Sequence, residues 1–367
     1  MTMTQTKIRH REPIKNANLL MTIAICIFLA MYVTAYFTWG GAYRKPQMFM
    51  DILNNNAFLI IIGCSLTIVM ITGGIDISVG GVVGLVSMVV IMFLKGRFCS
   101  LEGITPGVQV AFAVGIAALI GMMFGAIQGG LVAFLEIQPF IVTLAGMFFA
   151  RGLITILSPV PVQLTGKENP ELLEILQHRV DIPWLASPNK KGTMIPARLE
   201  IGAFIAIAIL IIIAIMLKKS KLGRNFYAVG GNRQSALMLG INARRTRFIA
   251  HLISGLLAGI AGFVFATHTV SGNSTNGSAS EMDAIAASII GGTLLSGGVG
   301  NVVGTFFGVL ILATIKAIVL SAGLREPWWQ TITSGLMLAF FILLQSVVLS
   351  SRGKKMKLPE WMQFRKA

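Results

Sequence analysis

One acidic residue, Asp76, lies between two apolar runs in the stretch TIVMITGGIDISVGGVVGLVSMVV, in a chain whose charged residues make up only 12% of the total. Gly73 and Gly74 suit the end of a helix, where a positive φ is needed. The side chain of Asp76 or Ser78 can accept hydrogen bonds from the amides that open the next helix, and an anion there faces the positive end of the helix dipole. We expect this turn to cap a helix, or to line a path where irregular backbone meets water or solute.

Other polar side chains and glycines interrupt apolar runs elsewhere. Arg151 lies a few residues inside the predicted outer end of its run, within reach of the interface, so anchoring competes with a pathway role. Glu281 and Asp283 precede an apolar run and favour its N-terminus electrostatically. The candidate residues for a solute path or its helix breaks are Asn54, Asn55, Asn56, Thr67, Gly73, Gly74, Asp76, Ser78, Arg151, Gly291, Gly292 and Ser296.

Catalytic and metal-binding patterns are missing from the sequence. The glycine-containing stretch AVGGNRQSAL lacks the Lys-Ser/Thr pair of a phosphate-binding loop, and the four His residues are scattered. Cys26 and Cys64 lie in apolar runs and Cys99 in a short loop, which gives no metal-ligand spacing or obvious disulfide pair. We expect no enzyme activity, cofactor or metal in this chain, so any ATP would be hydrolysed by a partner chain.

The elements that must position these residues are long and apolar. The 367 residues are 55% hydrophobic with a mean hydropathy of +0.79, too apolar for an ordinary soluble domain. A bilayer core about 30 Å thick needs roughly 20 apolar residues per helix. Strands are not expected. Ten runs are present, near 17–39, 52–72, 80–94, 108–134, 139–157, 199–217, 247–269, 284–296, 302–320 and 328–349. The sequence predicts one all-α membrane domain, 1–367, with about ten transmembrane helices, of which 80–94 and 284–296 are short enough to be broken or re-entrant.

Basic residues predict the orientation. The net charge of +16 is concentrated in loops, so membrane topology explains it better than nucleic-acid binding. The basic segments are 1–16, 218–247 and 351–367, and all three are expected in the cytoplasm. An even number of predicted passages separates the first segment from each of the other two, which agrees with this orientation. The same parity places 158–198 and 270–283 outside and Asp76 and Glu136 near the cytoplasmic face. Segment 158–198, with a possible amphipathic piece at 168–179, is either a solvated connector or a platform for an external partner.

Two glycine-containing breaks share a weak internal sequence similarity. Gly73-Gly74, Ser78 and 82–84 match Gly291-Gly292, Ser296 and 302–304, the second copy being two residues longer. A repeat suits a transporter whose halves surround a central path, although chance similarity in glycine-rich membrane sequence is an alternative.

Four stretches together resemble one family: LTIVMITGGIDISVGG, QPFIVTLAGMFFARGL, GRNFYAVGGNRQSALMLGIN and EMDAIAASIIGGTLLSGGVGNVVGTFFGVL. They run in order through nearly the whole chain and are similar to the permease subunits of bacterial ABC sugar importers of the ribose, xylose, arabinose and galactose type. Gly73, Gly74, Asp76 and Ser78 match the family's T-G-G-I-D-L-S-V-G turn, with Ile77 in place of the usual Leu. The long loop 158–198 departs from the family, so its partner contact and the identity of the sugar stay open.

The resemblance implies a multi-pass protein of the bacterial inner membrane that alternates access. Its implied partners are cytoplasmic ATPase subunits, a periplasmic sugar-binding protein, a second permease subunit in a homodimer or heterodimer, and membrane lipid. The implied fold is similar to that of type II importer permeases such as the cobalamin permease. Two alternatives remain: an ion-coupled secondary transporter, which scarce buried acids and histidines disfavour, and an ABC permease for branched-chain amino acids or nucleosides.

The resemblance also gives a role to the segment NRQSALMLGI. Its flanking charges alone would keep the loop cytoplasmic, but a short helix from about Asn232 to Leu239 is suited to docking into a cleft of the ATPase. Ser235 and Leu239 would share one side, Ala236 would allow close approach, and Gly240 would end the helix. The predicted ATPase-contact residues are Gly230, Gly231, Asn232, Ser235, Ala236, Leu239 and Gly240.

Overall fold

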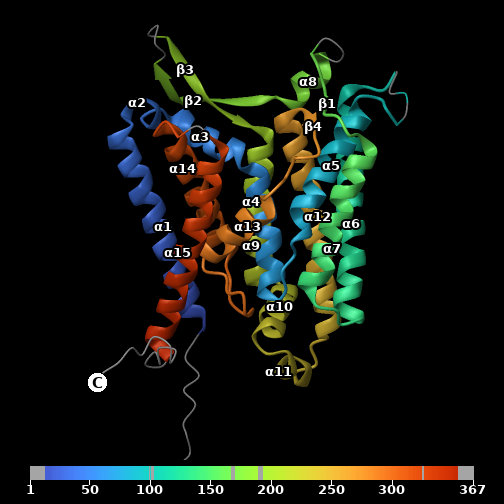
Figure 1. Ribbon diagram of the computed structural model, residues 1–367, viewed down its shortest axis with the longest axis vertical. Helices are drawn as coiled ribbons and strands as arrows, with labels where there is room; N and C mark the ends of the chain where they lie inside the picture. The colour runs from blue at the N-terminus through green and yellow to red at the C-terminus, as the bar shows by residue number, and fades with distance from the viewer. Residues whose placement is uncertain are drawn as a thin grey trace, which may run out of the picture.

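The computed structural model describes residues 13–98, 100, 103–166, 170–188, 193–324 and 326–353. Most of the basic N-terminal and C-terminal segments, and Cys99, therefore lie outside the described residues. The chain forms a helical bundle with a β-hairpin at one end (Figure 1). The helices are α1 (Pro13–Thr38), α2 (Gly40–Tyr43), α3 (Pro46–Asn55), α4 (Ala57–Ile71), α5 (Ser78–Leu94), α6 (Pro106–Phe134), α7 (Pro139–Leu157), α8 (Pro170–Leu176), α9 (Ile201–Lys219), α10 (Lys221–Gly231), α11 (Arg233–Met238), α12 (Ala243–Thr269), α13 (Ser280–Ile290), α14 (Val302–Ser321) and α15 (Pro327–Gly353).

Within the described residues, seven helices are long and apolar enough to cross a membrane, or eight if the bent pair α3 and α4 forms one span. The all-α polytopic prediction is confirmed, whereas the count of ten is not. The difference comes mainly from the two short runs: α5 has 17 residues and α13 has 11. Both follow breaks inside the bundle, so neither needs the length of a full span.

The centre of the bundle is made by α4, α5, α12, α13 and α14. Nearly every residue of α4 and α5 is buried, as expected of helices that are apolar all round. The outer helices α6, α7, α9 and α15 instead expose large apolar side chains, including Phe149, Ile212 and Leu343. Such surfaces face lipid or another subunit in a membrane protein.

Glycines let α6 and α12 approach unusually closely. Gly121 and Gly125 on α6 meet Gly255 and Gly259 on α12, and a Cβ added at Gly121 would collide with the carbonyl oxygen of Gly255. In each helix, three residues separate the two glycines, which is the spacing that brings membrane helices into backbone contact. This contact fixes α12, which carries part of the polar centre described below.

The two glycine pairs of the internal sequence similarity lie at helix ends of the same kind. The Gly73 amide donates to Met70 O and the Gly74 amide to Val69 O, and Gly73 has a φ of 82°. Gly292 has a φ of 91°, and the bonds that follow Gly291 repeat the pattern at the end of α13. Both are Schellman ends, which favour glycine because the C′ residue is left-handed. The equivalent residues are Gly73 and Gly292, so the two helix ends are offset by one residue from the sequence match of Gly73-Gly74 with Gly291-Gly292.

The hairpin end corrects the expectation that strands are absent. Strand β2 (Arg179–Pro188) pairs antiparallel with β3 (Met194–Glu200), and short strands β1 (Val162–Gln163) and β4 (Ser271–Gly272) also pair. These strands lie beyond the spans, where water can satisfy their edges. Helix α8 lies within the predicted amphipathic piece 168–179. The hairpin and α8 are at one end of the bundle, while α10, α11, the start of α1 and the end of α15 are at the other (Figure 1).

Candidate functional site

The carboxylate of Asp76 ties the first break, residues 72–77, to two helices. Oδ1 accepts hydrogen bonds from the Ser78 amide at 3.1 Å and the Ser78 hydroxyl at 2.6 Å, and Oδ2 accepts from the Ser254 hydroxyl of α12 at 2.6 Å. The Ser78 hydroxyl also bonds Gln128 on α6. Asp76 is 2% exposed, so its charge is balanced by hydrogen bonds and by the N-terminus of α5. The capping role predicted for this residue is confirmed.

The position of Asp76 can be followed along the helices that surround it. Its partner Ser254 lies about 16 Å along α12 from Ala243, at about 1.5 Å per residue. Gln128, which bonds Ser78, lies about 9 Å from the end of α6 by the same rise. Thr143, which bonds Ile75 O in the same break, lies only about 6 Å from the start of α7. Asp76 is therefore buried between helices, toward the end of the bundle that holds α10, and its place near the cytoplasmic face stays a prediction.

A second polar cluster lies beside the first break. Thr67 is fully buried; its hydroxyl lies 2.6 Å from that of Thr305 on α14 and 3.3 Å from that of Ser288 on α13. Ser65 on the same helix bonds Ser254 at 2.7 Å, which connects the cluster to Asp76. These hydroxyls satisfy one another, so the seam joins α4, α12, α13 and α14 in a fixed arrangement.

A second break, residues 270–279, enters the bundle from the hairpin end. Arg151 of α7 donates to Asn276 O at 2.6 Å and to Ser274 O at 3.3 Å, and the Asn276 side chain bonds Ser87 on α5 at 3.1 Å. Arg151 therefore points inward and packs against this break, and its role in a solute path stays a prediction. The segment predicted as an external loop dips into the membrane part of the bundle.

Glu281, directly after this break, is the least satisfied acidic residue of the centre. It is 8% exposed, and its Oε2 has no hydrogen-bond partner among the residues that the structure describes. A Cβ added at Gly80, in the first turn of α5, would collide with that oxygen. A carboxylate oxygen buried without a partner is costly. It is therefore a group with capacity for a further hydrogen bond.

Asp283 pairs with Lys316, a residue that the sequence reasoning did not single out. Lys316 Nζ lies 2.5 Å from Asp283 Oδ2, and both side chains are partly buried. The pair joins α13 to α14. A lysine inside the apolar run 302–320 was the available signal, because a cation at that depth needs a partner.

The remaining predicted pathway residues do not gather at the centre. Asn54 bonds the backbone of Arg198 and Glu200, which anchors β3 to α3, and Asn56 donates to Ile52 O in its own helix. Asn55 and Ser296 are exposed. Their pathway role stays a prediction that the geometry does not strengthen, whereas Thr67, Asp76, Ser78 and Arg151 do meet around the breaks.

The predicted short helix near residue 235 is confirmed as α11. Asn232 accepts from the Ser235 amide at 3.0 Å at its start, and Gly240, with a φ of 77°, ends it. Ala236 is only 2% exposed and packs against Val229 and Ala243, so its side chain is not available to a partner. This corrects the placement of Ala236 on a docking face.

The tip of α11 instead exposes three consecutive apolar side chains. Leu237, Met238 and Leu239 are 52%, 87% and 78% exposed. A charge at buried Ala236 would disrupt the packing of α11, whereas a charge at Met238 would test docking alone. An exposed apolar cluster of this kind on a loop is typical of a contact with another protein.

Helix α10 joins α11 to the breaks. A Cβ added at Gly230 would collide with Ile71 O at the end of α4, whereas one at Gly231 would have its nearest neighbour at 4.0 Å. The Tyr227 hydroxyl donates to Gly300 O at 2.8 Å, and burial raises the pKa of Tyr227 to about 12, so the hydroxyl stays protonated. Gly298, in the segment 291–301, donates to Ile71 O at 2.8 Å. A shift of α10 therefore acts directly on the end of α4 and on the segment 291–301.

Glu136, in the turn between α6 and α7, connects that turn to the region around α11. It lies 2.7 Å from Arg233 and 3.4 Å from Arg244. The hydrogen bond from Arg233 and its charge hold the pKa of Glu136 below its usual value, with Arg244 adding to the effect. All three side chains are substantially exposed, so this is a surface ion pair that salt screens.

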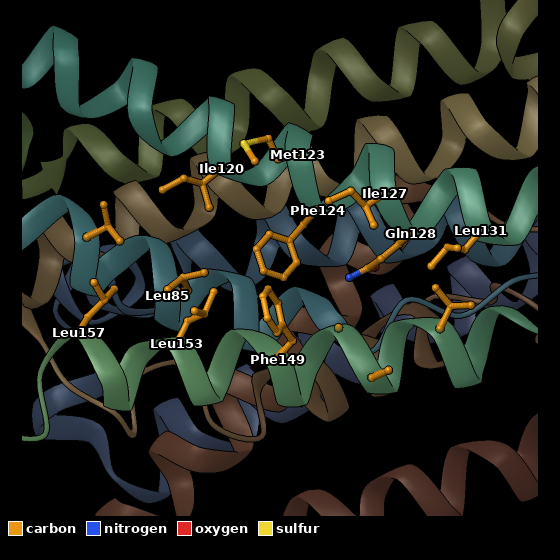
Figure 2. A pocket seen from close by; sticks show the side chains of 14 residues that line it. Leu85, Ile120, Met123, Phe124, Ile127, Gln128, Leu131, Phe149, Leu153 and Leu157 are labelled. Atoms are coloured by element: carbon orange, nitrogen blue, oxygen red, sulfur yellow. The ribbon is translucent and has the colours of Figure 1, made fainter.

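Figure 2 shows a cavity of about 530 Å³ between α5, α6 and α7. Apolar side chains such as Phe124, Phe149 and Leu85 line it, and Gln128 is the polar exception. Such a lining does not suit a hydroxylated solute, which needs several hydrogen-bonding groups. No group of three or more possible metal ligands occurs in the described part of the chain.

Several residues at the centre were not candidates from the sequence: Gln128, Ser254, Ser65, Ser288 and Thr305. Each is a lone polar residue in a long apolar run, which was the signal available. Serine and threonine are common in membrane helices because they bond the backbone of their own helix, so that signal does not say which of them meet.

Comparison with known proteins identifies the group to which these features belong. A family model described as branched-chain amino acid transport system / permease component matches residues 48–342. The chain is 35% identical, over 89% of its length, to the inner membrane ABC transporter permease protein YjfF of Escherichia coli, of which the match covers 92%. It is 31% identical, over 90%, to the fructose import permease protein FruG of Bifidobacterium longum, and 27% identical, over 91%, to the xylose transport system permease protein XylH of Escherichia coli; the matches cover 92% and 93% of these proteins. No solved structure matches the chain significantly.

Proposed function

The chain belongs to the family of transport-system permease components, and on that premise we propose that it carries a monosaccharide across the bacterial inner membrane by alternating access. It is a multi-pass transport subunit and not an ATPase. The observation that carries the sugar assignment is similarity along about nine-tenths of the chain to permeases named for fructose import and xylose transport. The helix breaks at the centre support the same function, because irregular backbone inside a membrane protein lines a cavity or path.

The route by which energy enters is the second part of the proposal. A cytoplasmic ATPase subunit docks on the exposed tip of α11, formed by Leu237, Met238 and Leu239. The movement passes through α10 to the end of α4 and to the segment 291–301, because Gly230 lies against Ile71 and Gly298. The closeness of this contact supports the route, since packed backbone cannot absorb a displacement by rotating a side chain.

The sugar path is proposed to pass the second break. Glu281 offers a carboxylate oxygen without a partner, and Arg151 holds the break from α7. Sugar hydroxyls pair well with carboxylate and guanidinium groups, which supports their use here. The first break is less suited, since both carboxylate oxygens of Asp76 are already bonded.

The remaining assignments concern partners and orientation. Both termini and α11 lie in the cytoplasm, a periplasmic binding protein delivers sugar at the hairpin end, and a second permease subunit completes the path. Single cysteines at Ser187 and Ser235 in a Cys-free background test the orientation with an impermeant label. We expect the reagent to label intact cells from outside only at position 187. Labelling only at position 235 would contradict this orientation.

The decisive test of function is transport by the assembled system. Proteoliposomes are loaded with ATP, the chain is combined with its ATPase, and the binding protein and labelled fructose or xylose are supplied outside. We expect uptake that needs ATP and both partners. Uptake driven by a proton or sodium gradient without the ATPase would establish a secondary transporter instead. Because the family model is described by branched-chain amino acids, leucine uptake in the same assay is the control for a different solute.

A further inference from the structure

A second cavity lies at the α10–α11 end of the bundle, on the side of α9. Its volume is about 600 Å³, and it is enclosed by the last turns of α9, one face of α10 and the segment 298–303 that leads into α14. Leu217, Ala228 and Val302 are among its apolar walls, and Lys218 and Arg224 are its basic members. Of the groups described above, Tyr227, Gly231, Gly298 and Gly300 also border this cavity, whereas the carboxylates and hydroxyls of the two breaks do not.

The two basic side chains have no acidic counterpart. Neither Lys218 nor Arg224 forms an ion pair within the described residues; Arg224 Nη1 donates only to the carbonyl oxygen of Lys219, at 3.3 Å. The whole segment 218–247 contains no Asp or Glu. Both side chains are exposed. The cavity therefore presents two uncompensated positive charges beside apolar walls, and the positive end of α14 faces the same space.

An apolar track leads from this cavity along α9. Ile211, Ile215 and Lys218 are spaced as i, i+4 and i+7, so they lie on one face of the helix. Ile211 and Ile215 are 52% and 53% exposed. A membrane-spanning helix exposes such residues to acyl chains, and its terminal lysine lies at the depth of the headgroups.

Helix α10 has the character of a helix that lies in the interface. It buries Gly223, Phe226 and Val229 and exposes Lys221 and Arg224 on the other side. It follows α9 after only Ser220, which caps it through a bond from the Gly223 amide. An amphipathic helix with basic residues at the end of a span is suited to contact with anionic lipid.

We propose that this cavity binds the headgroup of an anionic phospholipid, with Lys218 and Arg224 holding the phosphate and the acyl chains lying along Ile211 and Ile215. Free phosphate would use the two charges but leave the apolar walls and the track on α9 without a role. A protein occupant would have to enter at the level of the headgroups, whereas the exposed apolar tip of α11 lies beyond it. Because α10 contacts α11, the end of α4 and the segment 291–301, bound lipid at this cavity also steadies the helix that connects the proposed ATPase contact to the breaks.

The test uses the complete transporter, purified with its ATPase and reconstituted in nanodiscs of phosphatidylcholine with phosphatidylglycerol. Intact-complex mass spectrometry then counts the phosphatidylglycerol that survives delipidation. The double variant Lys218→Gln, Arg224→Gln is compared with Lys219→Gln, Arg245→Gln, which removes the same charge outside the cavity and outside α10. We expect the first to lose retained lipid about 25-fold, the product of the roughly fivefold that each basic residue near an anionic surface contributes, and the control to keep it.

A second variant makes the result independent of charge. Ala214→Trp fills the apolar part of the cavity and should release the lipid although both basic residues remain. Equal retention in the cavity variants and the wild type would overturn the proposal. So would displacement of phosphatidylglycerol by inorganic phosphate at the same occupancy, which would show a free anion site. A neutral lipid retained as firmly as phosphatidylglycerol would also contradict it.

Discussion

The two breaks at the centre of the bundle use similar residues but differ in how fully they are satisfied. In the break 72–77, both carboxylate oxygens of Asp76 accept hydrogen bonds, from Ser78 and from Ser254. Beside the break 270–279, Glu281 is also buried, yet its Oε2 has no partner among the described residues. A satisfied buried network fixes a structure, whereas an unsatisfied one costs free energy until a partner arrives. The first break is therefore a fixed joint, and the second is the one that we propose for the solute.

Helix α7 touches both breaks and so connects their roles. The Thr143 hydroxyl donates to Ile75 O at 3.2 Å in the first break, and Arg151 donates to Asn276 O at 2.6 Å in the second. The two contacts are eight residues apart on one helix, about 12 Å at a rise of about 1.5 Å per residue. A movement that tilts α7 changes both breaks together.

The largest expected effect comes from Asp76→Leu. The change leaves the Ser78 and Ser254 hydroxyls unpaired, which costs about 1–3 kcal/mol for each buried group. We expect loss of the folded protein, measured as the yield of monodisperse chain after detergent extraction. Asp76→Asn keeps an oxygen for Ser78 and can donate to Ser254, so it should fold and transport far better. Equal loss of transport in both variants, with normal insertion, would show that the charge itself is essential.

A contrast between adjacent glycines tests the connection from α10 to the first break. Gly230→Ala pushes a methyl group into Ile71 O, and overpacking of this kind costs about 1–3 kcal/mol. We expect ATP hydrolysis to continue while sugar uptake falls. Gly231→Ala has the same change in helix propensity but open space around it, and should behave as the wild type. Similar behaviour of the two variants would break the proposed connection.

Glu281→Gln probes the second break without changing its shape. If the free oxygen bonds the sugar, the loss of a hydrogen bond to a charged group, about 1.5–3 kcal/mol, lowers uptake about 10- to 150-fold. Thermal stability and ATPase association should be unchanged. A variant that transports normally would remove Glu281 from the path, and one that fails to fold would place it with Asp76 as a structural group.

The smallest effect is expected at Glu136, outside both breaks. Its pKa in the folded chain is depressed by Arg233, so the ion pair stabilises the α11 region above the unfolded pKa and is lost as pH falls through the lower, folded value. Glu136→Gln should therefore speed amide hydrogen exchange in α11 slightly at neutral pH, and high salt should have the same effect on the wild type. Below the lowered, folded pKa of Glu136, the two proteins should converge. Unchanged exchange at neutral pH would show that the pair does not hold α11.

The sequence predicted local structure well where glycine and capping residues determine it. The end of α4 at Gly73, the cap at Asp76 and the helix between Asn232 and Gly240 all follow from backbone requirements that a single sequence displays. The family and its transport role followed from four stretches of the chain that occur in a fixed order.

The prediction was wrong where long-range packing decides. Ala236 was placed on an exposed face, because its burial depends on Val229 and Ala243, from the elements that flank α11. Arg151 was given the option of reaching the interface, because the direction of a side chain cannot be read from its position along one helix. The β2–β3 hairpin was missed because hydropathy describes spans and says little about the loops between them.

The measurement that tests the account most directly is ATPase association with Met238→Glu. Met238 is 87% exposed at the tip of α11, so the charge should not disturb the fold, but it should weaken a docked apolar contact by about 2 kcal/mol or more, roughly 30-fold. Trp184→Glu, at a residue 83% exposed on the hairpin at the opposite end, is the matched control. The account predicts that the ATPase co-purifies with the Trp184 variant and is lost from the Met238 variant. Wild-type association and sugar-stimulated hydrolysis in Met238→Glu would contradict it.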